Sequence, residues 1–196
     1  MSYVMAIEEN TYNMLDYIHD KSTDYLLFNE GVSLDGFDLK LIYKAKSKSI
    51  FNKIKKFHML FTTGPELVSR ELRSVLECVV PAEIEFFDAE VIYGNERLNG
   101  FSVINVIRKI NCCNMEESEY ELTNFDPNNP TYIFLYTVLL DEIPCNFNVV
   151  RCSEQPTSIV VSAEIKSAIS NAGLKGITFC KAIDVTYKER TICEKI

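Results

Sequence analysis

The chain has 196 residues, of which 47% are hydrophobic and 24% charged, and it carries 20 lysines and arginines against 28 aspartates and glutamates. This is the composition of one ordinary water-soluble globular domain over residues 1–196, long enough to bury about 70% of its unfolded surface without disulfides or a metal ion. The net charge of −8 argues against a nucleic-acid-binding protein, and no apolar run approaches the roughly 18–20 residues of a membrane-spanning helix.

The first third of the chain predicts two strands. Residues 2–7 are β-branched or aromatic enough for a first strand, which we place within residues 1–10. The same ten residues lack the basic and apolar regions of a secretory signal peptide, so we expect a cytoplasmic protein. Residues 11–19 are ambiguous, with apolar side chains at helical spacing, whereas residues 38–43 alternate in polarity like a strand near a sheet edge.

A lysine-rich segment, residues 37–60, interrupts the acidic chain. It holds seven lysines against one aspartate, a net charge of +6, while residues 1–36 carry −6 and residues 61–150 carry −10. Lysine-rich stretches can bind phosphate-rich partners. The simpler interpretation is a solvated loop and strand edge whose lysines pair with acidic neighbours, and we expect no nucleic-acid partner.

The clearest helix signal starts at Ser69. A serine can cap the helix N-terminus there, and Glu71 lies near the positive end of the helix dipole. Apolar side chains follow at i, i+3, i+4 and i+7, which is the spacing of one buried helix face: Leu72, Val75, Leu76 and Val79. Pro81 ends the helix, and residues 83–87 then alternate between polar and apolar like a half-buried strand.

The second half of the chain predicts further strands and a second helix. In order, we expect a strand at 101–107, an acidic segment at 115–122, a loop at 125–130 and a strand at 132–140. The second helix follows the strand-like start of residues 159–164, and its apolar face is formed by Ile165, Ala168, Ile169 and Ala172. Gly173 stands where a C-terminal cap belongs, and a strand begins at 177.

An internal duplication explains the similarity of the two helix regions. A shift of 93 residues places seven identical residues in the 24 positions 68–91, including Ser69 on Ser162. The predicted fold class is therefore α+β, with two pseudo-repeated strand-helix-strand modules, each an antiparallel sheet with a helix packed on it. The two halves are approximately residues 37–110 and 131–196.

The seven cysteines do not predict a metal site. They lie at positions 78, 112, 113, 145, 152, 180 and 193, without the close Cys-x-x-Cys pairs of a zinc site, and the chain has only two histidines. Most are flanked by apolar or β-branched residues, as buried thiols are. We therefore expect reduced, buried cysteines, no metal ion and no cofactor.

Catalytic motifs are missing from the sequence. It contains no phosphate-binding loop, dinucleotide fingerprint, HExxH or GxSxG motif. A nucleophile–histidine pair could be built only around His19 or His58, and the neighbours of His58 favour a strand position next to the core over a catalytic one. The sequence therefore predicts no catalytic residue.

Acidic residues gather in two segments, which are Glu83, Glu85, Asp88 and Glu90, and then Glu116, Glu117, Glu119 and Glu121. Alternating acids of this kind can mark the solvent faces of strands. They can also supply the two carboxylates of a hydrolase, which need contrasting environments in one cleft. A third interpretation is a surface that binds a basic protein partner, and on charge alone we take all eight as candidate partner-binding residues.

A series of motifs in residues 60–185 is collinear with those of a known protein family. They are the segments 65–76, 84–89, 101–106, 114–120, 138–144 and 159–179, and the most specific is Ser162-x-x-Ile165 with Gly173-Leu-x-Gly176-x-x-Phe179. By these motifs the chain resembles a bacterial immunity-protein family, immunity protein eleven. It departs from that family at Asn114, where Asp is usual, at Val150-Arg151, where Phe-Arg is usual, and over the first 60 residues, which match poorly.

The resemblance implies a function that the composition only permits. Members of this family are understood as cytoplasmic antidotes, encoded beside polymorphic toxins of interbacterial competition, that bind and block a cognate toxin domain without a cofactor. It implies a non-enzymatic protein that occludes the toxin's active site or substrate path and is a monomer or weak homodimer when free. The matching residues are core, cap and turn positions, so no binding residue is transferred. A carboxylate-dependent hydrolase and a homodimeric interaction module remain the alternatives.

Overall fold

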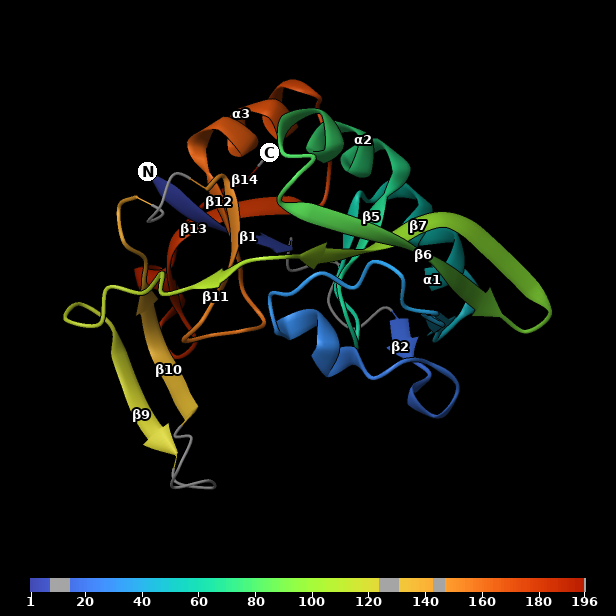
Figure 1. The fold of residues 1–196 in the computed structure, drawn as a ribbon, viewed down its shortest axis with the longest axis horizontal. Helices are drawn as coiled ribbons and strands as arrows, with labels where there is room; N and C mark the ends of the chain where they lie inside the picture. Colours follow the sequence, from blue (N-terminus) through green and yellow to red (C-terminus); the bar gives the residue numbers. More distant parts are fainter. Residues whose placement is uncertain (8–14, 124–130, 143–146, 196) are drawn as a thin grey trace.

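The computed structural model describes residues 1–7, 15–123, 131–142 and 147–195. Within these ranges the chain forms two curled mixed sheets and three α-helices, an α+β architecture (Figure 1). Two of the helices lie side by side across the top of both sheets in this view, and the N-terminus lies within the sheet that also holds the C-terminal strands.

One sheet is built from the first half of the chain. Its six strands run in the order β2 (Leu15–Tyr17), β3 (Ile42–Ala45), β6 (Ile84–Tyr93), β7 (Glu96–Val106), β5 (Leu67–Ser69) and β4 (Met59–Leu60). All neighbours are antiparallel except β3 and β6, which are parallel. The long β6–β7 pair carries most of this sheet and extends to the right in Figure 1.

The other sheet combines the N-terminal strand with the second half of the chain. Its order is β8 (Lys109–Ile110), β11 (Val149–Cys152), β12 (Ile159–Ser162), β1 (Ser2–Ile7), β13 (Ile177–Asp184), β10 (Thr131–Val138) and β9 (Glu119–Thr123), and β14 (Ile192–Lys195) also pairs with β13. The β8–β11 pair is parallel. The prediction of purely antiparallel sheets is therefore wrong, because strands distant in sequence enter both sheets in the parallel direction.

Serine caps start the two longer helices, as predicted. Helix α2 (Arg70–Val79) begins after Ser69, whose side chain accepts a hydrogen bond from the Leu72 amide, and α3 (Ala163–Asn171) begins after Ser162, which does the same for Ile165. A third helix, α1 (Lys48–Lys53), was not predicted. None of the helices in the described ranges is long and apolar enough to cross a membrane.

The largest hydrophobic cluster is shared by the two sheets. Leu72 and Leu76 of α2 and Ile165 and Ile169 of α3 are each at most 1% exposed, and they pack together with side chains from strands of both sheets. Full burial of one such side chain contributes about 1.5–3 kcal/mol to the free energy of unfolding. The apolar faces predicted for the two helices therefore pack against one common cluster, except that Ala172, the last residue of the second predicted stripe, is exposed.

The lysine-rich segment folds differently from the prediction. Part of it is helix α1 rather than a loop, because Ser47 caps the helix and Phe51 and Ile54 are buried in the core. Two of its lysines pair with acidic residues, as expected: Lys46 with Asp16, at 3.4 Å, and Lys48 with Glu96.

Two local strand predictions also change. The strand expected at 38–43 starts only at Ile42, and it lies between β2 and β6 rather than at an edge of the sheet. The end of the ambiguous segment 11–19 is strand β2, since Leu15 and Tyr17 alternate with Asp16 and are buried. The loop expected at 125–130 lies outside the described residues.

The expectation that all cysteines are reduced is wrong for one pair. Cys180 of β13 and Cys193 of β14 form a disulfide, because the antiparallel register places them directly opposite each other. Cys112, Cys113 and Cys152 are buried thiols as expected, Cys78 is an exposed thiol, and Cys145 lies outside the described residues.

Candidate partner-binding surface

The first acidic segment lies along strand β6, and its first member joins the two sheets. Glu83 directly precedes β6, and its carboxylate accepts hydrogen bonds from the backbone amides of Asn148 and Val149, each at 2.8 Å. Val149 opens strand β11 of the other sheet. This carboxylate therefore acts as a bridge between the sheets.

Glu85 holds another part of the chain in place. Its carboxylate accepts hydrogen bonds from the Leu34 amide at 2.8 Å, from the Asn105 side chain at 3.0 Å and from the Ser33 hydroxyl. Burial acts to raise the pKa of Glu85, but the hydrogen bonds from Ser33, Leu34, Asn105 and Asp35 favour the charged form and lower the pKa overall. The segment around Leu34 is thereby fixed against β6.

Asp88 and Glu90 line a hollow of about 550 Å³ between α2 and the β6–β7 pair. Arg73 of α2 contacts the Asp88 carboxylate at 3.2 Å, and Arg97 of β7 pairs with Glu90. The Asp88 side chain is nevertheless 93% exposed. Because each carboxylate faces an arginine, the hollow lacks the contrasting pair of acid environments that a two-carboxylate hydrolase needs.

The second acidic segment lies on the other sheet. Glu116 and Glu117 are exposed in a turn that Asn114 stabilises. The side-chain amide of Asn114 donates a hydrogen bond to the Glu117 carboxylate at 2.9 Å and accepts one from the backbone amide of Glu116. Glu119 and Glu121 are exposed on strand β9. Strand β9 lies at the lower left of Figure 1, far from β6, so the fold does not bring the two predicted acidic segments together.

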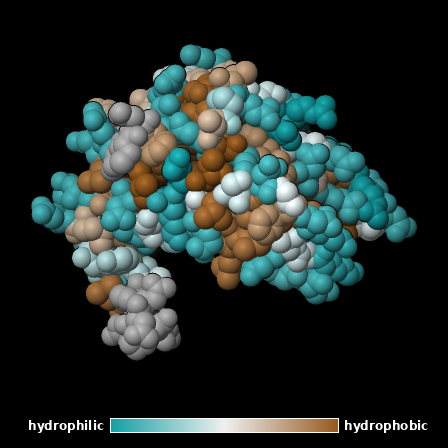
Figure 2. Space-filling model, viewed as in Figure 1, coloured by the Kyte–Doolittle hydropathy of each residue, from teal (hydrophilic) through white to brown (hydrophobic). Residues whose placement is uncertain are grey.

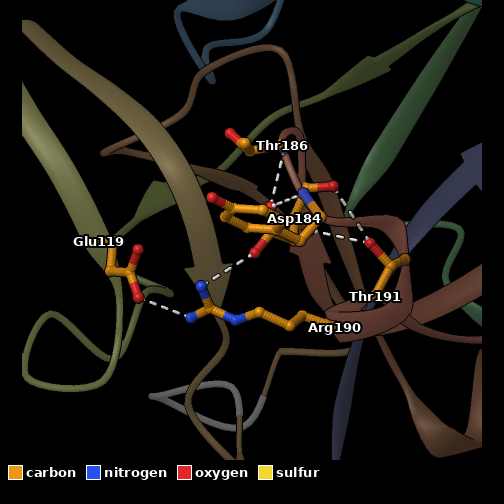
Figure 3. A network of polar contacts seen from close by, with 6 residues as sticks. Glu119, Asp184, Thr186, Arg190 and Thr191 are labelled. Carbon is orange, nitrogen blue, oxygen red and sulfur yellow. Dashed lines mark hydrogen bonds and ion pairs between the residues drawn. The ribbon is translucent and has the colours of Figure 1, made fainter.

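A polar network attaches β9 to the rest of its sheet (Figure 3). Arg190 lies between two carboxylates, with one nitrogen 2.6 Å from Glu119 and another 3.2 Å from Asp184. Asp184 also accepts hydrogen bonds from the backbone amides of Thr186 and Tyr187. The Glu119 carboxylate therefore helps to position its strand. The carboxylates of Glu116 and Glu121 form no ion pair or hydrogen bond with other described residues.

Exposed apolar side chains accompany the acids on the β9–β10 pair. Leu122 is 54% exposed on β9, and Ile133 and Leu135 are 49% and 38% exposed on β10. Tyr120 packs its ring against the partly buried Tyr132 and the buried Phe134 of β10, at centroid distances of 5.2 and 5.6 Å. Sequence reasoning missed these residues, because alternation reveals a strand but not which of its faces stays uncovered.

Hydrophobic surface is not confined to this strand pair. In Figure 2 hydrophobic residues also gather near the middle of the visible face, while the tip of the β6–β7 pair is hydrophilic. Leu26 and Val32 are each 50% exposed on the half of the chain that forms the β6 sheet. Single exposed apolar residues are normal on proteins, whereas several beside acidic groups on one strand pair are typical of an interaction site.

His58 contacts a serine and an acid, but the arrangement is not that of a catalytic triad. Its Nδ1 atom lies 2.9 Å from the Ser69 hydroxyl and 3.7 Å from the Glu71 carboxylate. Both partners therefore share one ring nitrogen, whereas a triad uses the two nitrogens for base and orienting contacts. Ser69 is occupied as the cap of α2, and His19 packs against the rings of Tyr17 and Tyr25.

One group in the described chain could hold a metal ion. Cys113, Cys152 and Glu154 place their ligand atoms within 4.8 Å of one another, and all three residues are buried. Burial raises the pKa of Glu154. The two cysteines do not have the spacing of a zinc motif in the sequence, since 38 residues separate them.

Comparison with known proteins assigns the family. No curated protein matches the chain. A family model described as "Immunity protein family (Imm11)" matches residues 28–184, which include most strands of both sheets and the three α-helices. The resemblance noted between residues 60 and 185 is thus confirmed and extends further toward the N-terminus. The chain belongs to the Imm11 immunity protein family.

Proposed function

We propose that this protein neutralises a cognate bacterial toxin domain by binding it and covering its active site or substrate path. The family match over residues 28–184 is the observation that carries this proposal. An immunity protein of this kind needs a recognition surface and no catalytic group of its own. The paired carboxylates of the hollow beside α2 and the shared nitrogen of His58 agree with a binding protein.

We place the recognition surface on the β9–β10 pair and the turn before it. Glu116, Glu117 and Glu121 are exposed there, and the strand register places the half-exposed side chain of Ile133 directly opposite Glu121, on the same face of the pair. Exposed apolar residues supply the buried centre of an interface, and the surrounding acids attract a basic partner and speed its association. Many toxins of this kind attack nucleic acid and are basic, which would suit such a surface.

The acids along β6 form the second part of the candidate surface. The carboxylates of Glu83 and Glu85 accept hydrogen bonds from other parts of the chain, so we expect them to shape the surface rather than to contact the toxin. Asp88, with its exposed side chain, and Glu90 remain candidate contacts at the rim of the hollow beside α2.

We also propose that the two sheets descend from a duplicated module. The strand order β4-β5-β7-β6 in one sheet corresponds to β11-β12-β1-β13 in the other, and each neighbouring pair is antiparallel in both. In each sheet a serine-capped helix connects the second strand of this order to the fourth. The N-terminal strand β1 would then occupy the place that β7 has in the first module.

A matched pair of charge-reversal variants tests the proposed surface. The variant Glu116→Lys/Glu117→Lys/Glu121→Lys changes the β9 region, and the control Asp20→Lys/Asp35→Lys/Asp38→Lys makes the same charge change at exposed positions on the other half. We expect the first variant to bind the toxin at least about tenfold more weakly, a loss of about 1.4 kcal/mol, and with a smaller dependence on salt.

The measurement is calorimetric titration of the toxin domain at low and high salt concentration. The control variant should bind within about twofold of the wild type at both salt concentrations, because only the overall charge differs. Equal weakening by both variants would place the effect in the net charge, and no weakening by either would remove the β9 region from the interface.

A further inference from the structure

Three buried side chains from two parts of the chain meet below the β8–β11 pair. Cys113 follows β8, Cys152 ends β11, and Glu154 lies two residues further on. Cys113 is 4% exposed, Cys152 1% and Glu154 9%. The parallel pairing of β8 with β11 brings these segments together, although the sequence separates them by about forty residues.

The spacing of their ligand atoms matches a tetrahedral metal site. The two sulfur atoms lie 3.6 Å apart, and the Cys152 sulfur lies 3.2 Å from a carboxylate oxygen of Glu154. With zinc–sulfur and zinc–oxygen distances of about 2.3 and 2.1 Å, tetrahedral angles require about 3.8 Å between two sulfurs and about 3.6 Å between sulfur and oxygen. These two distances are within a few tenths of an ångström of the required values, and the third, from the Cys113 sulfur to the Glu154 carboxylate, is at most 4.8 Å.

The electrostatics of Glu154 provide a second observation. Its carboxylate accepts hydrogen bonds from the Cys112 amide at 3.1 Å and from the Cys152 thiol. No lysine, arginine or histidine of the described chain forms an ion pair with it. Buried carboxylates in proteins are generally paired with a cation or coordinate a metal ion.

We propose that Cys113, Cys152 and Glu154 bind a thiophilic divalent cation, with Zn²⁺ as the natural occupant. Two thiolates and one carboxylate are ligands that Zn²⁺ accepts, and water completes the fourth position. On binding, the two thiol protons pass to solvent, and the cation compensates the charge of the buried carboxylate. The Cys112 amide orients Glu154 as an outer-shell donor, an arrangement common around metal ligands.

The position in the fold suggests a structural role for the ion. It would connect the segment after β8 to the end of β11, two short strands at the edge of their sheet. None of the three proposed ligands belongs to the candidate toxin-binding surface. Metal binding and toxin binding can therefore be tested separately.

Cobalt titration of the full-length protein, with the Cys180–Cys193 disulfide intact and Cys113 and Cys152 as thiols, tests the site. Co²⁺ bound by thiolates in tetrahedral geometry gives a near-ultraviolet charge-transfer band and intense visible bands, and Zn²⁺ should abolish both by displacing it. We expect saturation at one equivalent for the wild type and for the control Cys78→Ser, which removes an exposed thiol elsewhere. Cys113→Ser and Cys152→Ser should lose the charge-transfer band, and Glu154→Gln should weaken binding at least tenfold.

A second measurement covers variants that fail to fold. Zn²⁺ should raise the melting temperature of the wild-type protein in proportion to the logarithm of its concentration, because it binds only the folded state. The absence of a charge-transfer band in wild-type protein with Cys113 and Cys152 as thiols would overturn the proposal. So would an unchanged band in Cys113→Ser, or a Cys113–Cys152 disulfide in protein prepared without oxidant.

Discussion

Individual polar side chains hold segments of this protein together that the sequence does not place near each other. Glu83 connects β6 to β11, and Arg190 connects β9 to β13. Arg151 is fully buried, donates to the Pro156 carbonyl at 3.1 Å and lies 3.8 Å from Glu66, which precedes β5 in the other sheet. Several charges that look like solvent-facing residues in the sequence are thus part of the internal structure.

Glu85 provides a residue-scale prediction that depends on pH. Its pKa is lowered in the folded protein, so its contribution to stability is complete above the unfolded value of about 4.5 and is lost as pH falls through the folded value. Glu85→Gln should lower the free energy of unfolding by about 1–2 kcal/mol at pH 7, because three donors lose a charged acceptor.

Urea unfolding at pH 7 and pH 3 measures the effect. The difference between wild type and Glu85→Gln should shrink as pH falls from 7 to 3, because protonation of the wild-type carboxyl increases as pH approaches its lowered folded pKa. Glu121→Gln, at an exposed position, is the control and should leave stability unchanged at both values. A difference that stays constant between pH 7 and pH 3 would contradict the assigned hydrogen bonds.

At the scale of the elements, the helices α2 and α3 could be predicted and the sheets only in part. A helix is specified by neighbouring residues: the caps Ser69 and Ser162 and one apolar stripe each were visible in the sequence. The partners of a strand lie elsewhere in the chain. Alternation therefore indicated most strands, but not that β1 enters between β12 and β13 or that β3 runs parallel to β6.

In the candidate site, too, the residues could be predicted from the sequence but their partners could not. The eight acids were visible as charges, but their partners come from other strands, so sequence reasoning could not separate bridging Glu83 and Glu85 from exposed Glu116 and Glu121. The cluster around Cys152 was invisible because its ligands meet only through the β8–β11 pairing. Helix α1 was missed because its lysines suggested a solvated loop.

The helix caps yield a prediction at the scale of elements. Ser69→Ala and Ser162→Ala should each lower the free energy of unfolding by about 1 kcal/mol, because each leaves helix N-terminal amides without an acceptor. Thermal unfolding should show a decrease of about 2–4 °C for each variant. Ser74→Ala, at an exposed position inside α2, should be neutral or slightly stabilising, and an equal loss there would argue against the capping explanation.

The β9–β10 pair yields a second prediction at this scale. Ile133→Ser should weaken toxin binding at least about tenfold while changing the free energy of unfolding by about 0.5 kcal/mol or less, because the side chain is half exposed in the unbound protein and lies on the same face as Glu121. Leu26→Ser is the matched control, since Leu26 is 50% exposed on the other half. Titration calorimetry measures toxin binding and urea unfolding measures stability, so the two effects are separated. If only Leu26→Ser weakened toxin binding, the interface would lie on the other half of the molecule.

At the scale of the whole molecule, two mixed sheets share one hydrophobic cluster beneath two capped helices, and each sheet also has a cluster of its own. This arrangement presents strand edges and turns of both sheets at opposite ends of the long axis, with β9 at one end and the β6–β7 pair at the other (Figure 1). A shared core with exposed strand ends suits a protein that must recognise one particular partner. We expect a monomer or weak homodimer in the absence of toxin, which light scattering after size-exclusion chromatography will distinguish.

Co-expression of this chain with the product of the neighbouring reading frame, which we propose is its toxin, tests the proposed function most directly. Cells that produce the toxin alone should stop growing, whereas cells that also produce this protein should grow, and the two proteins should purify together. The Ile133→Ser variant should protect less well than the wild type at equal expression. Failure of well-expressed, folded wild-type protein both to restore growth and to purify with the toxin would contradict the account.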